Sequence, residues 1–227
     1  MSNKVVFFGR SNCSTSKKIL NFLKIKFKKV IYVESKKIGK RLNENSKIFN
    51  TKIDYIFCFR SFYKLNKLLK KVRYTAINFH PSSPKYRGAG GVNFAMYSDK
   101  YFGCTAHIMS KKIDKGAIID CKFFKINKYS SLEKLLNKTY ILQFNQLKEV
   151  INGIILKKNY LKIKIKMNKN KWGKKFHTMK DLEKFYEISK NISKKKLNKK
   201  IKSTLIKDFK PYVIIHGKKF VLEVKKK

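Results

Sequence analysis

Arginine is nearly missing from an otherwise very basic chain. The sequence holds 57 Lys and Arg residues, of which only five are Arg, against 13 Asp and Glu, for a formal net charge of +44. Arginine makes the bidentate contacts by which proteins hold phosphates and read bases, so its scarcity argues against a dedicated nucleic-acid surface. Lysine, Asn, Ile, Phe and Tyr all have A/T-rich codons, and we attribute much of the charge to codon bias. RNA binding stays open as the alternative, because so large a charge attracts polyanions at low salt.

Paired cysteines and long apolar runs are also lacking. The four cysteines (Cys13, Cys58, Cys104 and Cys121) contain no Cys-x-x-Cys pair and no zinc-ligand spacing, so we expect reduced thiols and no metal site. The first apolar run, residues 5–8, is too short for a signal peptide. No run of about 18 apolar residues occurs, so no membrane span is expected. These features are typical of a cytoplasmic protein.

Short apolar runs alternate with helical patterns over the first two thirds of the chain. This alternation predicts an α/β fold, a Rossmann-like and mostly parallel sheet flanked by helices, whose ligands bind beyond the carboxyl ends of the strands. Polar residues 34–50 read as helix plus loop, and residues 65–72 as a helix. The predicted strands are Lys4–Phe8, Lys29–Val33, Ile53–Phe59, Thr75–His80, Gly103–Met109 and Ala117–Ile126.

A long amphipathic helix is expected to cover this sheet. Ser130-Ser131-Leu132-Glu133 has the pattern of a capping box, with Ser130 as the cap. One apolar stripe then runs to about Asn152 at helical spacing, and we interpret it as core. Its members are Leu132, Leu135, Leu136, Tyr140, Phe144, Leu147 and Ile151.

Residues 156–227 differ in character and are expected to form an appendage to a first domain at 1–155. Alternating apolar and basic residues predict a strand at 161–166, and helices are expected at 178–189 and 193–206. Residues 211–222 read as a hairpin that turns at His216-Gly217 and is a candidate dimer element. His177 and His216 read as surface residues. Trp172 reads as a packing residue, with stacking on a base or sugar as the alternative.

The candidate chemistry lies between Ile77 and Asp120. Side chains on a strand alternate, so Asn78 and His80 share one face at the end of the fourth strand. An amide and an imidazole placed side by side can both donate to a carbonyl oxygen that gains charge. Asp114 stands in a turn after the next strand, where it can orient an imidazole or take a proton. Taken singly, an Asn-x-His or an Asp-x-Gly is usually structural.

The joint order of these motifs resembles one family. Asn78-x-His80-Pro81-Ser82, Tyr86-Arg87-Gly88, Gly103-x-Thr105-x-His107 and Asp114-x-Gly116 are similar to the catalytic domain of formyltransferases that use 10-formyltetrahydrofolate. The resemblance implies that Asn78, His80 and Asp114 are catalytic and that His107 supports the site or touches the substrate. The chain departs from the family in one loop, where His80-Pro81-Ser82-Ser83-Pro84 is one residue shorter than His-Pro-Ser-x-x-Pro.

The resemblance also implies binding residues. The loop after the third strand lines the folate pocket in the family, which makes Arg60, Phe62, Tyr63 and Leu65, together with Ile113, candidate contacts for 10-formyltetrahydrofolate. Plain packing is the alternative for Phe62 and Tyr63. The acceptor is expected to contact the polar loop before the first helix or the middle of the stretch between Ile77 and Asp120. The candidate acceptor residues are Ser11, Asn12, Tyr86, Arg87 and His107. A helix cap by Ser14 or Ser16 is the alternative for the first loop.

The expected reaction is transfer of a formyl group to a primary amine. The short tail favours an amino sugar on a nucleotide carrier over methionyl-tRNA, because methionyl-tRNA formyltransferases usually carry a larger C-terminal barrel. Glycinamide ribonucleotide ranks third, since the first loop lacks the expected glycines, and hydrolysis of formylfolate ranks fourth. A nucleic-acid-binding module with an inactive core is the alternative of another class, and the intact trio argues against it.

Overall fold

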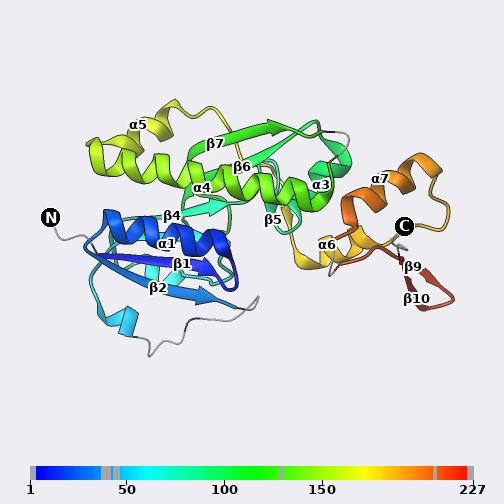
Figure 1. Ribbon diagram of the computed structural model, residues 1–227, viewed down its shortest axis with the longest axis horizontal. Helices are drawn as coiled ribbons and strands as arrows, with labels where there is room; N and C mark the ends of the chain where they lie inside the picture. Colours follow the sequence, from blue (N-terminus) through cyan, green and yellow to red (C-terminus); the bar gives the residue numbers. More distant parts are fainter. Residues whose placement is uncertain (1–3, 37–41, 43–46, 128–129, 207–208, 224–227) are drawn as a thin grey trace.

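A six-stranded sheet forms the centre of the protein (Figure 1). The computed structural model describes residues 4–36, 42, 47–127, 130–206 and 209–223. Strand order is β2-β1-β3-β4-β6-β7. The first four strands are parallel, β6 runs antiparallel to β4, and β7 runs antiparallel to β6. The predicted fold class is therefore confirmed. The strands are β1 (Lys4–Arg10), β2 (Lys29–Ser35), β3 (Ile53–Phe59), β4 (Val72–His80), β6 (Tyr101–Ile108) and β7 (Ile118–Lys125).

Apolar side chains fill both faces of the parallel strands, as expected for a sheet covered on two sides. On one face, Phe7 of β1 and Phe57 of β3 pack under α1 (Ser14–Lys26) and α4 (Leu132–Leu156), which lie along this face in Figure 1. On the other face, Phe8 and Ile56 pack with α2 (Asn66–Leu69) and η1 (Lys47–Asn50). Successive residues of one strand thus enter opposite halves of the core.

The inner face of α1 should contribute strongly to stability. Ile19 is fully buried in the cluster under α1 and α4, whereas Ile25 of the same helix is 81% exposed. Ile19→Ala should lower the free energy of unfolding by about 2–5 kcal/mol, because it removes buried apolar contacts and leaves a cavity. The same substitution at Ile25 should change it by less than about 0.5 kcal/mol. Urea unfolding of both variants measures the difference, and equal losses would contradict the assigned packing.

Several helix boundaries differ from those expected. Ser131, rather than Ser130, caps α4 by accepting from Lys134 N–H, so there is no capping box with Glu133, and the helix runs on to Leu156. A capping box forms instead between Thr178 and Asp181. The helix expected at 65–72 is only the short α2, because β4 already begins at Val72. Helix α3 (Gly91–Ser98) was not predicted.

The strand predicted at 161–166 is wrong, because these residues lie in α5 (Tyr160–Met167). Leu161 and Ile165 are one helical turn apart and pack against the core, while Ile163 between them is 52% exposed. Asn159 precedes the helix with φ of 65° and turns the chain back after α4. Alternation over six residues fits a strand and one face of a short helix equally well, and tertiary packing selected the helix.

The remaining C-terminal elements follow α5, and most of them lie beyond α3, at the right of Figure 1. They are β8 (Phe176–His177), α6 (Met179–Tyr186), α7 (Lys194–Thr204), β9 (Tyr212–Ile215) and β10 (Lys218–Val221). The hairpin turn at His216-Gly217 is confirmed. Strand β8 pairs with β5 (Arg87–Gly88), so contacts cross the predicted division at residue 155, which stays a prediction. Most of the predicted helix and loop at 34–50 lies outside the described residues, and none of the described helices is long and apolar enough to cross a membrane.

Candidate active site

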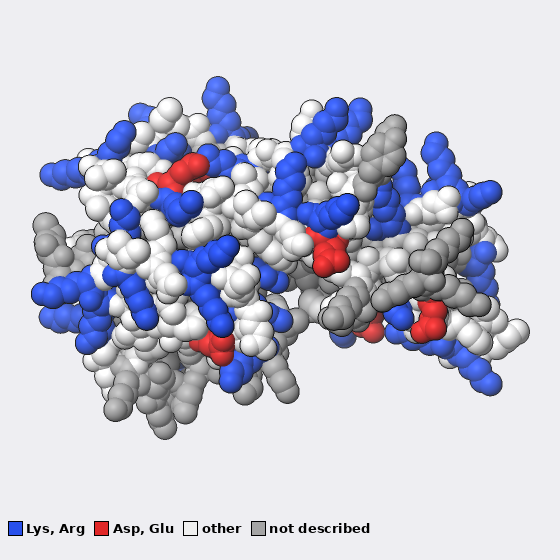
Figure 2. Space-filling model, in the orientation of Figure 1, with Lys and Arg blue, Asp and Glu red and all other residues white. Residues whose placement is uncertain are grey.

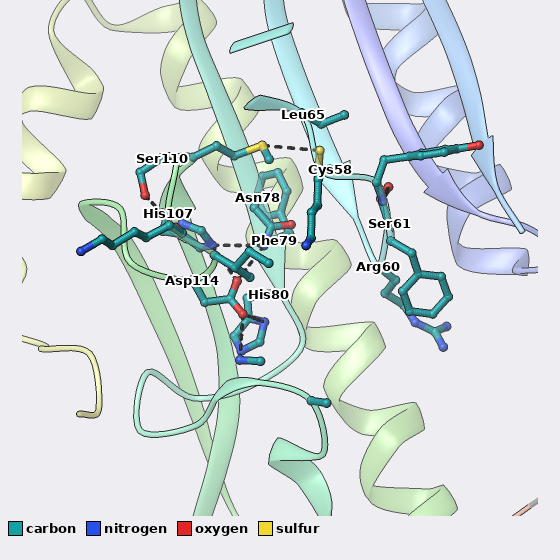
Figure 3. Close-up of a pocket in the computed structure, with 18 of the residues that line it drawn as sticks. Cys58, Arg60, Ser61, Leu65, Asn78, Phe79, His80, His107, Ser110 and Asp114 are labelled. Atoms are coloured by element: carbon teal, nitrogen blue, oxygen red, sulfur yellow. Dashed lines mark hydrogen bonds and ion pairs between the residues drawn. The ribbon is translucent and has the colours of Figure 1, made fainter. Parts of the chain in front are cut away.

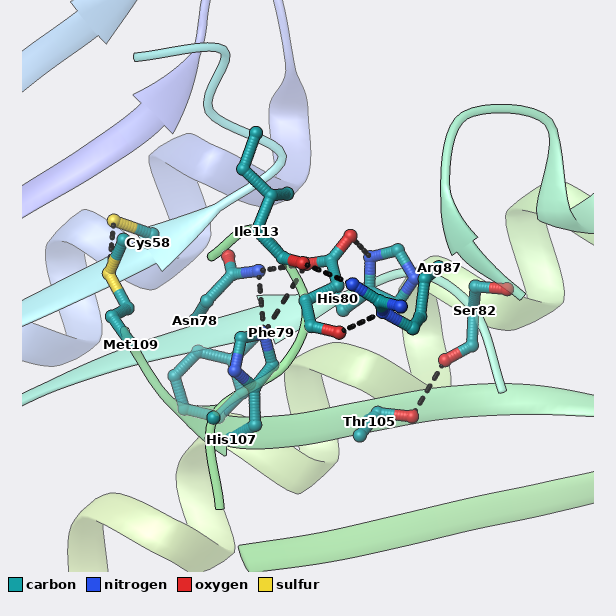
Figure 4. Close-up of polar contacts among 12 residues, drawn as sticks. Cys58, Asn78, Phe79, His80, Ser82, Arg87, Thr105, His107, Met109 and Ile113 are labelled. Carbon is teal, nitrogen blue, oxygen red and sulfur yellow. Dashed lines mark hydrogen bonds and ion pairs between the residues drawn. The ribbon is translucent and has the colours of Figure 1, made fainter. Parts of the chain in front are cut away.

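Four polar side chains from separate parts of the chain converge at the end of β4 (Figure 4). Asn78 and His80 come from β4, and the antiparallel register that pairs Asn78 with His107 brings in the second histidine from β6. Asp114 enters from the loop between β6 and β7, held at φ of 46°. The sequence-predicted trio is therefore assembled in space, with His107 as a fourth member.

The carboxylate of Asp114 is the centre of this cluster. Its Oδ2 accepts from Gly88 N–H at 2.9 Å and lies 3.5 Å from His80 Nδ1, and its Oδ1 lies 3.4 Å from His107 Nε2. Burial favours the neutral acid, but the two imidazoles and the Gly88 N–H outweigh it and hold the pKa of Asp114 well below its ordinary value. Asp114 is thus ionised at neutral pH although only 5% of it is exposed.

Both imidazoles are fixed on their far side by a main-chain carbonyl. His80 Nε2 lies 2.9 Å from Tyr86 O, and His107 Nδ1 lies 2.9 Å from Ile108 O. Since a carbonyl only accepts, each of these nitrogens must carry the proton of the contact. Both rings are buried and cannot rotate without losing a hydrogen bond.

Asn78 is the least buried member of the four. Its Nδ2 contacts His107 Nε2 at 3.1 Å and donates to Asp114 Oδ1 over a longer 3.4 Å. A long hydrogen bond at the edge of a cavity is readily exchanged for a substrate oxygen. Asn78 is therefore placed to donate to a carbonyl oxygen in the cavity.

Tyr86 and Arg87, predicted to bind the acceptor, are buried and engaged within the protein. The Tyr86 hydroxyl donates to Asp99 at 2.9 Å. Arg87 Nε donates to Asp114 O at 2.7 Å and its Nη2 to Ile113 O at 3.3 Å, as Figure 4 shows. Arg87 therefore fixes the loop that presents the Asp114 carboxylate.

A segment from the C-terminal part, residues 172–178, returns to this site and is called the returning segment below. Trp172 stands edge-on to the His107 ring, with centroids 5.0 Å apart, and donates from Nε1 to Gly116 O at 2.7 Å. Further along, His177 O accepts from Ala89 N–H at 2.8 Å, and β8 pairs with Arg87 and Gly88. The packing interpretation of Trp172 is confirmed. His177 is only partly exposed and packs at a tilt against Phe94, with ring centroids 4.3 Å apart, so it is more than a surface residue. His216 is exposed as predicted.

The cluster opens into a cavity of about 770 Å³ (Figure 3). All five residues predicted to contact the folate line it, as do the trio and His107. The predicted folate contacts are Arg60, Phe62, Tyr63, Leu65 and Ile113. Ser11, Asn12, Tyr86 and Arg87 are absent from its lining. The structure therefore brings together the catalytic and folate candidates but leaves these four acceptor candidates outside, and their binding roles stay predictions.

Sequence reasoning missed part of the lining. Arg10 at the end of β1 faces the cavity, and so does Tyr140, which was assigned to the core stripe of α4. Residues 176–179 close another side. The alternative for the first loop, a helix cap by Ser14 or Ser16, is wrong, because Cys13 is the N-cap of α1 and the Ser16 hydroxyl accepts from Arg10 N–H. The sequence offered one signal for Arg10, because arginine is rare in this chain and Arg10 stands just after a predicted strand. Residues 176–179 gave no local signal.

Cys13 differs from the other three thiols in its ionisation. Burial opposes ionisation, but hydrogen bonds from the Ser16 hydroxyl and N–H and the charge of Arg60 together hold the pKa of Cys13 below its ordinary value. Burial raises the pKa of Cys121 to about 12 and that of Cys58 and Cys104 further. All four cysteines are free.

Iodoacetamide at pH 7 should therefore modify Cys13 first, more than about tenfold faster than Cys121, because the thiolate is the reactive form. Since the pKa of Cys13 is lowered, its labelling should reach the plateau at a lower pH than labelling of the others. Mass spectrometry of tryptic peptides over a time course measures the order, with Cys13→Ser as control. First modification of Cys121 would contradict the expectation.

Comparisons with known proteins agree with this geometry. A family model described as Formyl transferase matches residues 32–151, more than half of the chain. The methionyl-tRNA formyltransferase of Hydrogenobaculum sp. (strain Y04AAS1) is 36% identical over 86 residues, which are 37% of this chain. That alignment spans only 28% of the relative's own length.

Solved structures of similar fold cover nearly the whole chain. A 4-N formyltransferase from Francisella tularensis superposes with a TM-score of 0.72 at 19% identity, over 100% of this chain and 99% of that one. An N-formyltransferase from Helicobacter canadensis, solved with folinic acid and dTDP-3-aminofucose, gives a TM-score of 0.72 at 17% identity over 95% and 85%. At these identities the likeness establishes a shared fold.

Proposed function

Because the chain belongs to the formyl transferase family, we propose that it transfers a formyl group from 10-formyltetrahydrofolate to a primary amine. The carrying observation is the convergence of Asn78, His80 and Asp114 at the wall of one cavity. Each residue type has a distinct use in acyl transfer: a donor for the carbonyl oxygen, a held imidazole and a buried carboxylate.

The cavity residues fit the proposed formyl donor. Leu65, Leu69, Met109 and Ile113 give one wall an apolar surface of the kind that flat heteroaromatic rings pack against. When bound there, 10-formyltetrahydrofolate supplies a formyl carbon that an amine can attack, with tetrahydrofolate as the leaving group. No metal is part of the proposal, and the described residues include no group of His, Cys, Asp and Glu arranged to hold one.

Asn78 donates an N–H to the formyl oxygen by exchanging its 3.4 Å contact with Asp114. The negative carboxylate of Asp114 stabilises the positive charge that the amine nitrogen gains. The proton that the amine loses passes through water to the folate nitrogen, as the bond between that nitrogen and the formyl carbon breaks. A carboxylate whose pKa is lowered is a weak base, so electrostatic stabilisation and orientation are its larger contributions. His80 and His107 hold that carboxylate in place from two sides. His80 therefore acts by positioning Asp114.

An amino sugar on a nucleotide carrier is the proposed acceptor. The support is the fold shared over nearly the full chain with a sugar N-formyltransferase from Shewanella sp. and with the N-formyltransferase that was solved with dTDP-3-aminofucose. Methionyl-tRNA is the second candidate, favoured by the sequence relatives and by the basic surface. Figure 2 shows Lys and Arg spread over the whole visible face instead of gathered in one track. That distribution favours the small acceptor.

The test is tetrahydrofolate release from 10-formyltetrahydrofolate with a panel of amino-sugar nucleotides and with initiator methionyl-tRNA. Acceptor-dependent release with a sugar nucleotide at moderate salt is the expected result. Release with tRNA alone would select the second candidate. No release with any amine, from protein that still binds the folate, would overturn the proposal.

A cytosolic location is also proposed, resting on the four free thiols.

A further inference from the structure

Two guanidinium groups meet at one end of the cavity. Arg10 ends β1 and Arg60 follows β3, two neighbouring parallel strands. Their register pairs Phe8 with Cys58, which brings Arg10 and Arg60 level two residues further on. Both side chains line the cavity. In Figure 3 Arg60 lies well apart from His107 and Asp114, so the cationic end is separate from the proposed reacting end.

Each guanidinium lies over an aromatic ring. The Cζ atom of Arg10 lies 4.0 Å from the centroid of Phe62, and that of Arg60 lies 3.8 Å from the centroid of Tyr140. Such stacking fixes the plane of a guanidinium while leaving its N–H groups to point sideways. Phe62 and Tyr140 thus pre-organise two planar donors at the cavity wall, at low further cost in side-chain entropy.

One donor of this pair has no partner in the protein, and another has a weak one. Arg10 Nη1 is shielded from water and has no hydrogen-bond partner, and the contact that Arg60 Nη1 makes is a weak one to Cys13 Sγ at 3.5 Å. A shielded donor without an acceptor costs free energy, so an acceptor from outside the chain would be bound favourably. By contrast, Arg87 donates to three main-chain carbonyls, and Arg73 lies 3.9 Å from Asp54.

Among the described residues, no carboxylate acts on Arg10. The pKa of Arg10 is lowered, first by burial and then by the charge of Arg60, and the other groups that act on it are Tyr140 and Cys13. None of these is a carboxylate. Two like charges held together in a partly buried place repel each other, and a bound anion removes that cost.

We propose that Arg10 and Arg60 form an oxyanion subsite that binds a phosphate or carboxylate carried by a substrate. A planar guanidinium can donate two parallel hydrogen bonds to the oxygens of a phosphate or carboxylate. The anion has two sources in the proposed reaction: the diphosphate of an acceptor nucleotide or the glutamate carboxylates of the folate. Assigning it to either substrate rests on the proposed function, whereas the subsite itself does not.

Calorimetric titration with inorganic pyrophosphate tests the subsite without turnover. Salt of about 0.3 M suppresses non-specific attraction to the surface lysines. Arg10→Gln and Arg60→Gln should each weaken binding by about tenfold or more, because a charged hydrogen bond is lost. Arg73→Gln is the matched control and should bind like wild type. Arg10→Lys, which keeps the charge but not the fork, should fall between wild type and Arg10→Gln.

Equal binding by wild type, Arg10→Gln and Arg60→Gln would overturn the subsite, and so would an equal loss in Arg73→Gln. Circular dichroism melts identify any variant that fails to fold, in which case Arg10→Lys carries the comparison. UDP and the pair 5-formyltetrahydrofolate and 5-formyltetrahydropteroate, which lacks the glutamate, then separate the two sources. Loss of UDP affinity in Arg10→Gln assigns the anion to the acceptor. Loss of affinity for the glutamate-bearing folate alone assigns it to the folate, and loss for neither ligand contradicts a substrate subsite. Failure of the proposed function appears separately, as absent tetrahydrofolate release by wild type.

Discussion

Asp114→Asn should lower the rate of formyl transfer by about 100- to 1,000-fold, the usual contribution of a fixed group that stabilises charge in the transition state. The carboxylate accepts from Asn78 Nδ2 on one oxygen and from Gly88 N–H on the other, and both imidazoles lie against it. An amide of the same shape has only one acceptor oxygen, so it cannot keep both hydrogen bonds. It also carries no negative charge to oppose the charge on the attacking amine. The loss should therefore fall mainly on kcat, with the apparent KM for the folate within about threefold of wild type.

The measurement is steady-state tetrahydrofolate release, with Asp54→Asn as control. Asp54 is on β3, accepts from Lys4 N–H at 2.8 Å and is no part of the cavity lining, so the same chemical change there should leave turnover intact. The far-ultraviolet circular dichroism of both variants should match wild type. A rate for Asp114→Asn within threefold of wild type would remove the carboxylate from the mechanism.

The reacting residues could be predicted from the sequence because strand geometry fixes them locally. Asn78 and His80 must share a face on any strand, and both lie at a carboxyl end where parallel sheets bind ligands. His107 follows once β6 pairs antiparallel with β4. The antiparallel pairing of β6 with β4 was not predicted. The sequence did indicate that β7 runs antiparallel to β6. The link from Ile108 to Ile118 is shorter than the dozen or so residues that a parallel crossover needs.

Contacts that depend on the path of the chain could not be predicted in this way. Trp172 reaches His107 from far along the sequence, after α4 and α5 have carried the chain back to the sheet. Nothing in the spacing around Trp172 specifies that return.

The polar side chains on the buried face of α4 were missed for a related reason. Gln143 looks polar in a periodicity analysis, yet it is fully buried and donates to Phe79 O, between Asn78 and His80.

Gly88→Ala should damage both stability and turnover, because Gly88 joins the returning segment to Asp114. Its N–H donates to Asp114 Oδ2, its φ is 82°, and a Cβ there would stand 2.2 Å from His177 O. A main-chain carbonyl cannot yield without breaking the pairing of β5 with β8. We expect a loss of about 2–4 kcal/mol in the free energy of unfolding, from backbone strain plus overpacking. Turnover should fall by about 100-fold, since a shift of 1 Å in a catalytic group has effects of that size.

Gly217→Ala separates the two causes. Gly217 has nearly the same backbone angle, φ of 72°, but a Cβ there would meet nothing within 4 Å. This variant should lose only the strain of a left-handed alanine, about 1–2 kcal/mol, and should keep its turnover. Denaturant unfolding and the release assay on both variants isolate the contact between Gly88 and His177. If Gly88→Ala retains turnover as Gly217→Ala does, Asp114 holds its place without the returning segment, and a chain cut before residue 172 should then remain active.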